Sequence, residues 1–185
     1  NKQNRGPTYS FNRGLFYAKE KLIARMDSDD VSHPQRFEKQ VNFLKNNKDY
    51  FVVGTGFNII NEEENKIKSI YLEKDKTKII KSLKFSNPIL NSSFMAYTNF
   101  KTKKLLYLKE IFYPADDYYC WSYVLDKGYN VTNLHELLQN YRIHNSESVL
   151  NSRIQGLKTL LIQKLFSVKK KISYEIKTNS LNSIK

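Results

Sequence analysis

A short apolar run that ends in a cluster of carboxylates constrains this chain more than any other stretch. Residues 22–24 (Leu-Ile-Ala) have the character of a short strand, and Asp27, Asp29 and Asp30 follow closely. Crowded carboxylates repel one another, so a folded protein keeps them when a cation or a hydrogen-bonded loop neutralises them. Oxygen ligands of this kind suit magnesium or manganese, which share their coordination with phosphates. The spacing alone leaves two interpretations open: a metal site, or an acidic turn that caps the next helix.

The spacing of apolar residues predicts strands that alternate with helices. Strand-like patterns occupy residues 22–24, 50–60, 66–72, 93–97, 130–134 and 137–143. Helical patterns occupy residues 11–18, 34–46, 76–85, 103–112, 116–127 and 150–168, and Ser32 is the expected N-cap of the second helix. This alternation predicts an α/β fold with a mixed sheet flanked by helices. The acidic cluster would lie at the C-terminal end of a strand, where open α/β sheets form ligand crevices.

A second acidic pair, Asp116 and Asp117, begins an aromatic-rich helix that closes at Gly128. Acidic residues in a first turn complement the helix dipole, so capping is the structural interpretation of this pair. The two acidic clusters, both at the ends of predicted elements, are the candidate functional positions of the chain.

The length of 185 residues suits one domain, and the net charge of +13 favours anionic partners. A non-catalytic nucleic-acid-binding domain is one alternative that this charge leaves open, although the lysines are spread along the chain and no recognised nucleic-acid motif occurs. One cysteine excludes an internal disulfide and fits a reducing compartment. No apolar run is long enough to span a membrane, and the first residues do not form a signal peptide. The absence of an initial methionine suggests a fragment or a trimmed chain.

Several motifs in a fixed order resemble family 2 glycosyltransferases of the GT-A fold, from about residue 4 to residue 148. The blocks are Ser10-Phe11-Asn12-Arg13-Gly14-Leu15; Ile23 to Asp30 with Pro34 to Gln40; Asn87 to Met95; and Asp116-Asp117-Tyr118 through Trp121, followed by Gly128-Tyr129 and Tyr141 to His144. The second block resembles the family's DxD motif, and the fourth resembles its "ED" motif. The resemblance implies a GT-A-like mixed sheet that is N-terminally truncated and carries a long C-terminal helix.

The resemblance implies a role for each matching residue. Asp27 and Asp29 match the DxD pair that binds a divalent metal, Mn²⁺ or Mg²⁺, and the sugar-nucleotide diphosphate. Asp117 matches the catalytic base that deprotonates the acceptor hydroxyl in an inverting displacement. His144 matches a histidine that approaches the diphosphate or the metal. Three further residues are expected to support the site: Asp30 by holding the loop or capping the next helix, Asp116 by its place beside the base, and Trp121 by packing the acceptor-side helix.

The chain also departs from the family pattern. The family's opening strand and the aspartates that bind the nucleobase are not found before Asn1, the first acid of the "ED" motif is Asp116, and Tyr119 and Tyr123 replace residues common in that helix. These departures motivate a further alternative, a catalytically inactive remnant of the fold.

The resemblance implies an enzyme that transfers a sugar from a nucleotide-sugar donor to a glycan or lipid-linked acceptor in surface polysaccharide synthesis. We expect residues 1–150 to form a partial glycosyltransferase domain, and residues 151–185 to form an amphipathic helix and a polar tail. The expected location is cytoplasmic. The lysine triplet 169–171 suggests contact with the inner face of the membrane, although a solvated helix end that complements the helix dipole is the favoured explanation.

Overall fold

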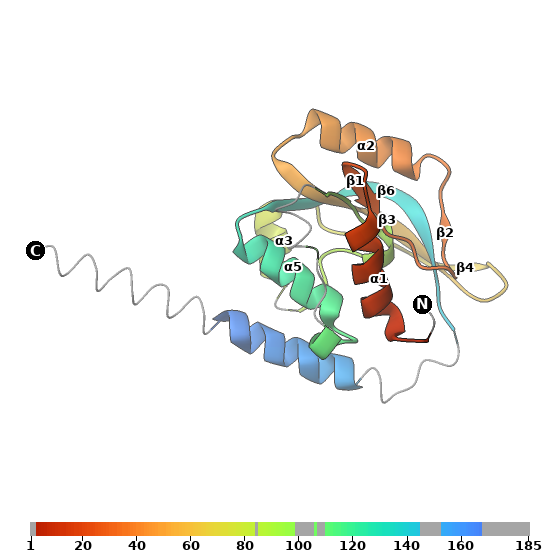
Figure 1. The fold of residues 1–185 in the computed structure, drawn as a ribbon. Helices are drawn as coiled ribbons and strands as arrows, with labels where there is room; N and C mark the ends of the chain where they lie inside the picture. Colours follow the sequence, from red (N-terminus) through yellow and green to blue (C-terminus); the bar gives the residue numbers. More distant parts are fainter. Residues whose placement is uncertain (1–2, 84, 99–105, 107–109, 145–152, 168–185) are drawn as a thin grey trace, which may run out of the picture.

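The computed structural model describes residues 3–83, 85–98, 106, 110–144 and 153–167. A mixed sheet with the strand order β1-β5-β3-β6-β2 forms its centre, and β4 pairs with β3 at one end (Figure 1). The strands are β1 (Leu22–Ala24), β2 (Val31–Ser32), β3 (Tyr50–Ile60), β4 (Lys66–Ile70), β5 (Met95–Tyr97) and β6 (Asn130–Arg142). Of the strand pairs, β3 and β6 run parallel, and the others are antiparallel. The predicted mixed α/β architecture is confirmed.

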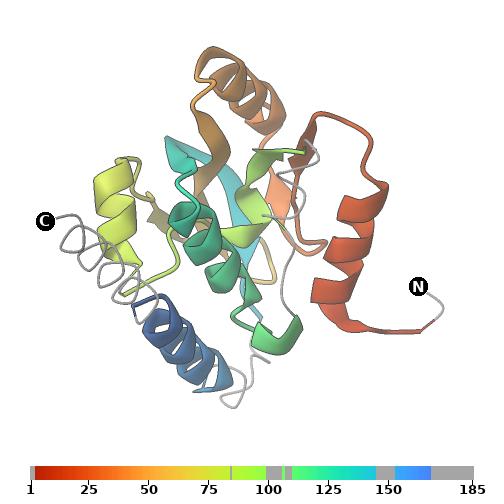
Figure 2. The same cartoon turned by 60° about the vertical axis from the view of Figure 1, so that its left-hand side comes forward.

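Helices cover both faces of this sheet (Figures 1 and 2). They are α1 (Gly6–Tyr17), α2 (Arg36–Asn46), α3 (Lys76–Ser82) and α5 (Asp116–Asp126), with short 3-10 turns η1 (Asn91–Ser93) and η2 (Glu110–Phe112) and a further helix at 153–167. Helix α2 lies on one face, and α1, α3 and α5 lie on the other. None of the helices in the described ranges is long and apolar enough to cross a membrane.

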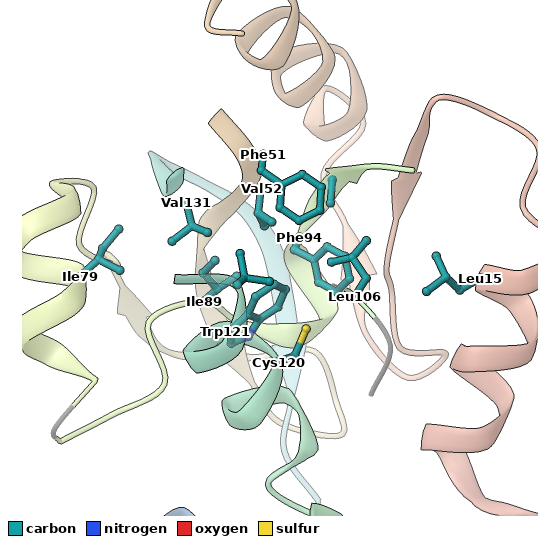
Figure 3. Close-up of a cluster of buried hydrophobic side chains, with 12 residues drawn as sticks. Leu15, Phe51, Val52, Ile79, Ile89, Phe94, Leu106, Cys120, Trp121 and Val131 are labelled. Atoms are coloured by element: carbon teal, nitrogen blue, oxygen red, sulfur yellow. The ribbon is translucent and has the colours of Figure 1, made fainter. Parts of the chain in front are cut away.

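Strand β3 is buried over residues 51–56, which explains the apolar run Phe51-Val52-Val53. Val52 points into a cluster with Trp121 of α5, whereas the next residue, Val53, packs with Leu44 of α2 on the opposite side (Figure 3). Successive residues of a strand face opposite sides of the sheet, so two adjacent valines serve two cores. The sheet is therefore the fixed frame from which the loops of the site project.

Two details differ from the sequence predictions. Residues 130–142 form one strand rather than two, because β6 stays paired with β3 across an irregularity: Thr55 lies opposite Leu134, and Gly56 lies opposite Leu137. Ser32 is not an N-cap. It pairs with Gln139 of β6, and α2 begins only at Arg36, so strand pairing replaces the expected capping role.

The predicted helix at 103–112 lies mostly outside the described residues, and its described end, η2, is a 3-10 turn. The helix at 153–167 falls within the predicted range 150–168. Its fully buried Ile162 packs against Ala115 and Tyr118 at the start of α5. The polar tail from residue 173 lies outside the described residues.

Candidate active site

The acidic loop after β1 is anchored through Asp30, which is buried. Its carboxylate accepts hydrogen bonds from Nε2 of Gln139 at 3.1 Å and from the backbone N–H of Arg142 at 3.0 Å. Oε1 of the same Gln139 accepts a bond of 2.7 Å from the buried guanidinium of Arg36. Burial lowers the pKa of Arg36 to about 10, although the negative charge of Asp30 acts to raise it. Buried charges need such partners, so this network joins the loop to β6 and α2.

None of the three aspartates occupies the N-cap of α2. That position belongs to Gln35, which forms no side-chain cap. Of the two interpretations that the spacing left open, capping of the next helix is therefore wrong. Asp30 supports the loop instead, because its carboxylate accepts hydrogen bonds from residues of β6 and does not cap the helix.

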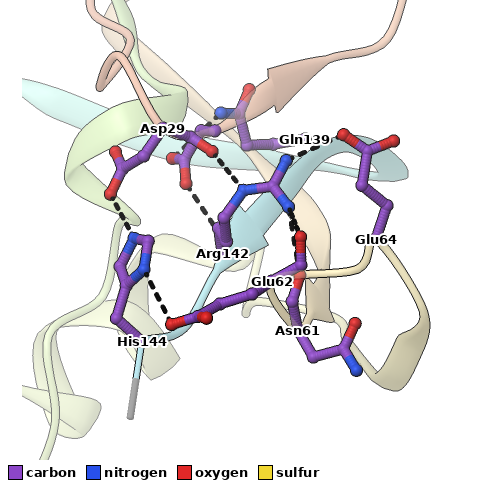
Figure 4. A network of polar contacts seen from close by, with 8 residues as sticks. Asp29, Asn61, Glu62, Glu64, Gln139, Arg142 and His144 are labelled. Carbon is purple, nitrogen blue, oxygen red and sulfur yellow. Dashed lines mark hydrogen bonds and ion pairs between the residues drawn. The ribbon is translucent and has the colours of Figure 1, made fainter. Parts of the chain in front are cut away.

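Asp29, in the loop after β1, lies close in space to the end of β6. There it belongs to a polar network centred on His144 and Arg142 (Figure 4). Nε2 of His144 lies 3.0 Å from Oδ2 of Asp29, and its Nδ1 lies 3.5 Å from Oε1 of Glu62. Arg142 donates through Nε to the backbone oxygen of Asp29 at 2.8 Å and pairs with Glu64 at 2.9 Å. The hydrogen bond to Asp29 raises the pKa of His144. The structure thus brings the predicted residues Asp29 and His144 together.

Asp27 is partly exposed and lies beside Arg25. Its Oδ1 lies 3.5 Å from Nε of Arg25, whose guanidinium also lies over the ring of Phe11 at 5.0 Å. Burial raises the pKa of Asp27, and the nearby positive charge of Arg25 opposes that rise. The cation thus favours the ionised form of a carboxylate that its surroundings partly desolvate.

Asp117 lies in the first turn of α5, and both of its oxygens are engaged. Oδ2 accepts a hydrogen bond of 2.6 Å from Nδ2 of Asn87, and Oδ1 accepts one of 2.7 Å from the backbone N–H of Tyr118. Burial raises the pKa of Asp117 to about 6, a value at which a carboxylate becomes a useful base near neutral pH. Its neighbour Asp116 accepts a buried bond of 2.8 Å from Oγ1 of Thr8, which ties α1 to α5.

One cavity of about 330 Å³ brings the two acidic clusters together. Asp27 and Asp117 both line it, together with a wall from residues 87–92. Its remaining lining residues are Phe57, Leu72 and Tyr141. Asp29 and His144 are not among the residues that line the cavity; they lie beside the acidic loop. Trp121 is 1% exposed and packs against Phe94 with ring centroids 5.0 Å apart, so it belongs to the core.

Sequence reasoning did not assign roles to Arg25 and Asn87. Both lie inside the motif blocks, but each also contacts a residue of a distant element: Arg25 lies over Phe11, and Asn87 donates to Asp117. The adjacency of Arg25 to the acidic cluster was a usable signal, whereas the bond from Asn87 to Asp117 spans 30 residues and has no counterpart in local spacing.

The carboxylates fit a divalent cation only together with phosphate oxygens. Within the described ranges, no three His, Cys, Asp or Glu side chains form a group that could hold a metal ion. The side chains of Asp27 and Asp29 are 42% and 47% exposed, so the carboxylate groups of both residues are accessible to a ligand. Mg²⁺ characteristically binds one or two carboxylates plus substrate phosphates and waters. The donor set is therefore compatible with a cation that arrives with a diphosphate.

Comparison with known proteins identifies the class. The profile described as Glycosyl transferase family 2 matches residues 1–106, and the chain belongs to this family. It is 37% identical to the O-antigen biosynthesis glycosyltransferase WbnJ of Escherichia coli, over 76% of this chain and 55% of that protein. It is 32% identical to the uncharacterized glycosyltransferase MJ1057 of Methanocaldococcus jannaschii, over 98% of this chain and 58% of that one. The chain spans about half the length of such relatives.

The fold is shared with a solved structure. TarS 1–349 of S. aureus, in complex with UDP, superimposes with a TM-score of 0.55 and 14% identity, over 83% of this chain and 45% of TarS. The amylovoran biosynthesis glycosyltransferase AmsE of Erwinia amylovora is a further relative, 28% identical over 76% of this chain and 52% of that protein. The predicted family and its GT-A-like architecture are confirmed.

Proposed function

We propose that this chain is the metal-binding and acceptor-side part of an inverting glycosyltransferase. The enzyme transfers a sugar from a nucleotide-sugar donor to a glycan or lipid-linked acceptor in surface polysaccharide synthesis. The observation that carries the proposal is that Asp27 and Asp117 line one cavity. Relatives named for O-antigen and amylovoran biosynthesis support the polysaccharide context.

Asp27 and Asp29 are the proposed ligands of Mn²⁺ or Mg²⁺, in company with the donor diphosphate. Such a cation, when bound, offsets the negative charge that develops on the departing diphosphate. Asp30 holds the loop at the position its hydrogen bonds to Gln139 and Arg142 define. His144, held by Asp29, would carry positive charge toward the same phosphates when protonated.

Asp117 is the proposed general base. Its bonds from Asn87 and from the N–H of Tyr118 fix the orientation of the carboxylate at the cavity wall. In its ionised form it would accept the proton of an acceptor hydroxyl as that oxygen attacks the sugar carbon. Asp116 supports this position through Thr8.

Peripheral contact with an anionic membrane is part of the proposal, because lipid-linked acceptors lie in membranes. The helix at 153–167 exposes Leu157 to 69% and Leu161 to 56%, while Ile162 holds it against α5. Exposed leucines beside an exposed lysine, Lys164, fit an interfacial helix. We place the enzyme in the cytoplasm, at the inner face of that membrane. Residues 1–150 would form the catalytic part, with the segment from 151 as its attachment.

Titration calorimetry of the full-length protein with UDP and Mn²⁺ tests the donor site. UDP is the probe because the TarS structure contains it. We expect Mn²⁺-dependent binding that weakens at least about tenfold in Asp29→Ala, since a ligand of the cation is lost. The matched control is Asp49→Ala, an exposed aspartate after α2. Binding that persists unchanged in Asp29→Ala, or in EDTA, would remove the proposed metal role.

A further inference from the structure

A second cavity, of about 770 Å³, lies where helix α3, helix α5 and the helix at 153–167 meet (Figure 2). None of the described residues lines both this cavity and the cavity of Asp27 and Asp117. Its volume falls within the range of about 300–1,000 Å³ that is typical of sites for small molecules. The second cavity is therefore large enough for a ligand of its own, and the proposed sugar transfer does not use it.

Hydrogen bonds between the three walls hold this cavity in shape. The hydroxyl of Tyr118 in α5 donates to the backbone oxygen of Leu83, which follows α3. Nε2 of Gln163 donates to the same oxygen at 3.4 Å, and Ile162 packs against Tyr118. Because these polar groups are engaged within the protein, the lining between them is left apolar and is ordered before any ligand arrives.

The apolar lining continues from the interior to the surface. Tyr118 is 5% exposed, whereas Ile80 is 38% exposed and Leu160 is 62% exposed. The other apolar lining residues are Leu83, Leu125 and Phe166. A lining that is buried at one end and exposed at the other suits a hydrocarbon chain that enters from the surface, because the burial of each methylene group is favourable.

The charges at the cavity favour an anion. Lys81 and Lys164 both line it and are exposed, and neither forms an ion pair with a carboxylate of the described residues. Asp126, the third charged lining residue, is already engaged within the protein. The chain beyond Ser167 carries lysines at 169–171, so like charge disfavours that segment as the occupant. Positive charge beside an apolar cavity matches a chain with an anionic head group.

We propose that this cavity binds one acyl chain of an anionic phospholipid, with Lys81 and Lys164 at the lipid phosphate. Leu160 lies on the same helix as the exposed Leu157 and Leu161, so the opening of the cavity adjoins the surface that we place against the membrane. The inference rests on the proposed membrane contact for the source of the lipid, and on the cavity for the binding itself. It adds a site for a single lipid molecule to a surface contact.

Titration calorimetry of the full-length protein with palmitoyl lysophosphatidylglycerol, below the concentration at which it forms micelles, tests the site. We expect one lysolipid to bind the wild type. Leu160→Glu places a carboxylate in the apolar lining and should weaken binding at least about tenfold. The matched control is Leu165→Glu, which changes the charge equally at an exposed position of the same helix that does not line the cavity. Circular dichroism confirms that both variants are folded.

The head group and the chain are tested separately. Lys81→Gln should weaken lysophosphatidylglycerol binding about two- to fivefold, as the loss of one exposed charge predicts, whereas Lys45→Gln on α2 should not change it. Zwitterionic palmitoyl lysophosphatidylcholine should bind more weakly, and glycerol phosphate, which lacks the chain, should not bind. Equal affinity for the two lysolipids would overturn the proposed recognition of an anion.

Binding of a monomeric lysolipid needs no vesicle, metal or nucleotide, which separates this inference from the proposed function. Loss of UDP binding or of vesicle flotation would overturn parts of that function and leave the lysolipid result readable. Absence of lysolipid binding, or equal binding by Leu160→Glu and Leu165→Glu, would overturn the site. A concentration-dependent dimer that Leu160→Glu dissociates, with no lysolipid bound, would assign the cavity to a second copy of the chain and overturn it as well.

Discussion

Asp27, which follows strand β1, and Asp117, in the first turn of helix α5, face the same cavity. Arg25 is electrostatically coupled to both carboxylates and opposes the rise in pKa that burial causes at each. Two acidic groups that lie far apart in the sequence thus share one cavity and the positive charge of one arginine side chain.

The pH dependence of turnover should report Asp117. A general base acts in its ionised form, so kcat/KM should rise with pH and level off above a pKa of about 6. In Asn87→Ala the carboxylate loses a hydrogen bond that favours its ionised form, so this limb should move to higher pH. Initial rates from pH 5 to 8 measure the shift, with Asn42→Ala, on the exposed face of helix α2, as the control. If the pH at which kcat/KM rises is the same in Asn87→Ala as in the wild type, this hydrogen bond does not influence the pKa of the base.

Stability should change with pH in the direction opposite to activity. The pKa of Asp117 is raised in the folded state above its ordinary value of 3.8, so ionisation penalises the fold as pH rises from about 4, fully so above about 6. Asp117→Asn removes this penalty. We expect the variant to gain up to about 3 kcal/mol in free energy of unfolding at pH 7.5, and little at pH 4.

Urea denaturation at the two pH values measures this difference. Asn87 can turn its amide to present the unpartnered Oδ1 to the new side chain, which keeps the contact satisfied. A gain of equal size at both pH values would show that packing, rather than ionisation, sets the effect.

Local sequence pattern was enough to predict the strand before Asp27 and the helix that begins at Asp116, because both depend on nearby residues. The network that joins Asp30, Gln139 and Arg36 could not be predicted, since it depends on the pairing of β2 with β6. The same pairing placed Ser32 in a strand. Register between distant strands, rather than local propensity, decided these positions.

Removal of Asp30 should destabilise the fold as well as the loop. Asp30→Ala leaves the Nε2 of Gln139 and the N–H of Arg142 unpaired, and leaves the buried cation of Arg36 without its compensating charge. We expect a loss of about 2 to 4 kcal/mol in free energy of unfolding. Asp49→Ala, at an exposed position, should stay within about 0.5 kcal/mol of the wild type. A small effect of Asp30→Ala in urea denaturation would contradict the anchoring role.

The exposed leucines of the helix at 153–167 should promote binding to anionic vesicles. Replacement of Leu157 and Leu161 by serine removes apolar contact area and should weaken binding at least about tenfold. Flotation with phosphatidylcholine vesicles that contain phosphatidylglycerol measures this, and binding should fall as salt increases. Ile67→Ser, on the exposed strand β4, is the control. Equal flotation of the double variant and the wild type would remove this helix as the attachment.

The most direct test of the account is to measure turnover and donor binding together in Asp117→Asn. We expect turnover of a nucleotide sugar by the full-length protein to fall by about 10²–10⁴-fold, since a general base is lost, while Mn²⁺-dependent UDP affinity changes little. Asp49→Asn should retain both. Unchanged turnover in Asp117→Asn would contradict the account, and a wild type that binds UDP yet transfers no sugar from any donor would favour the inactive remnant.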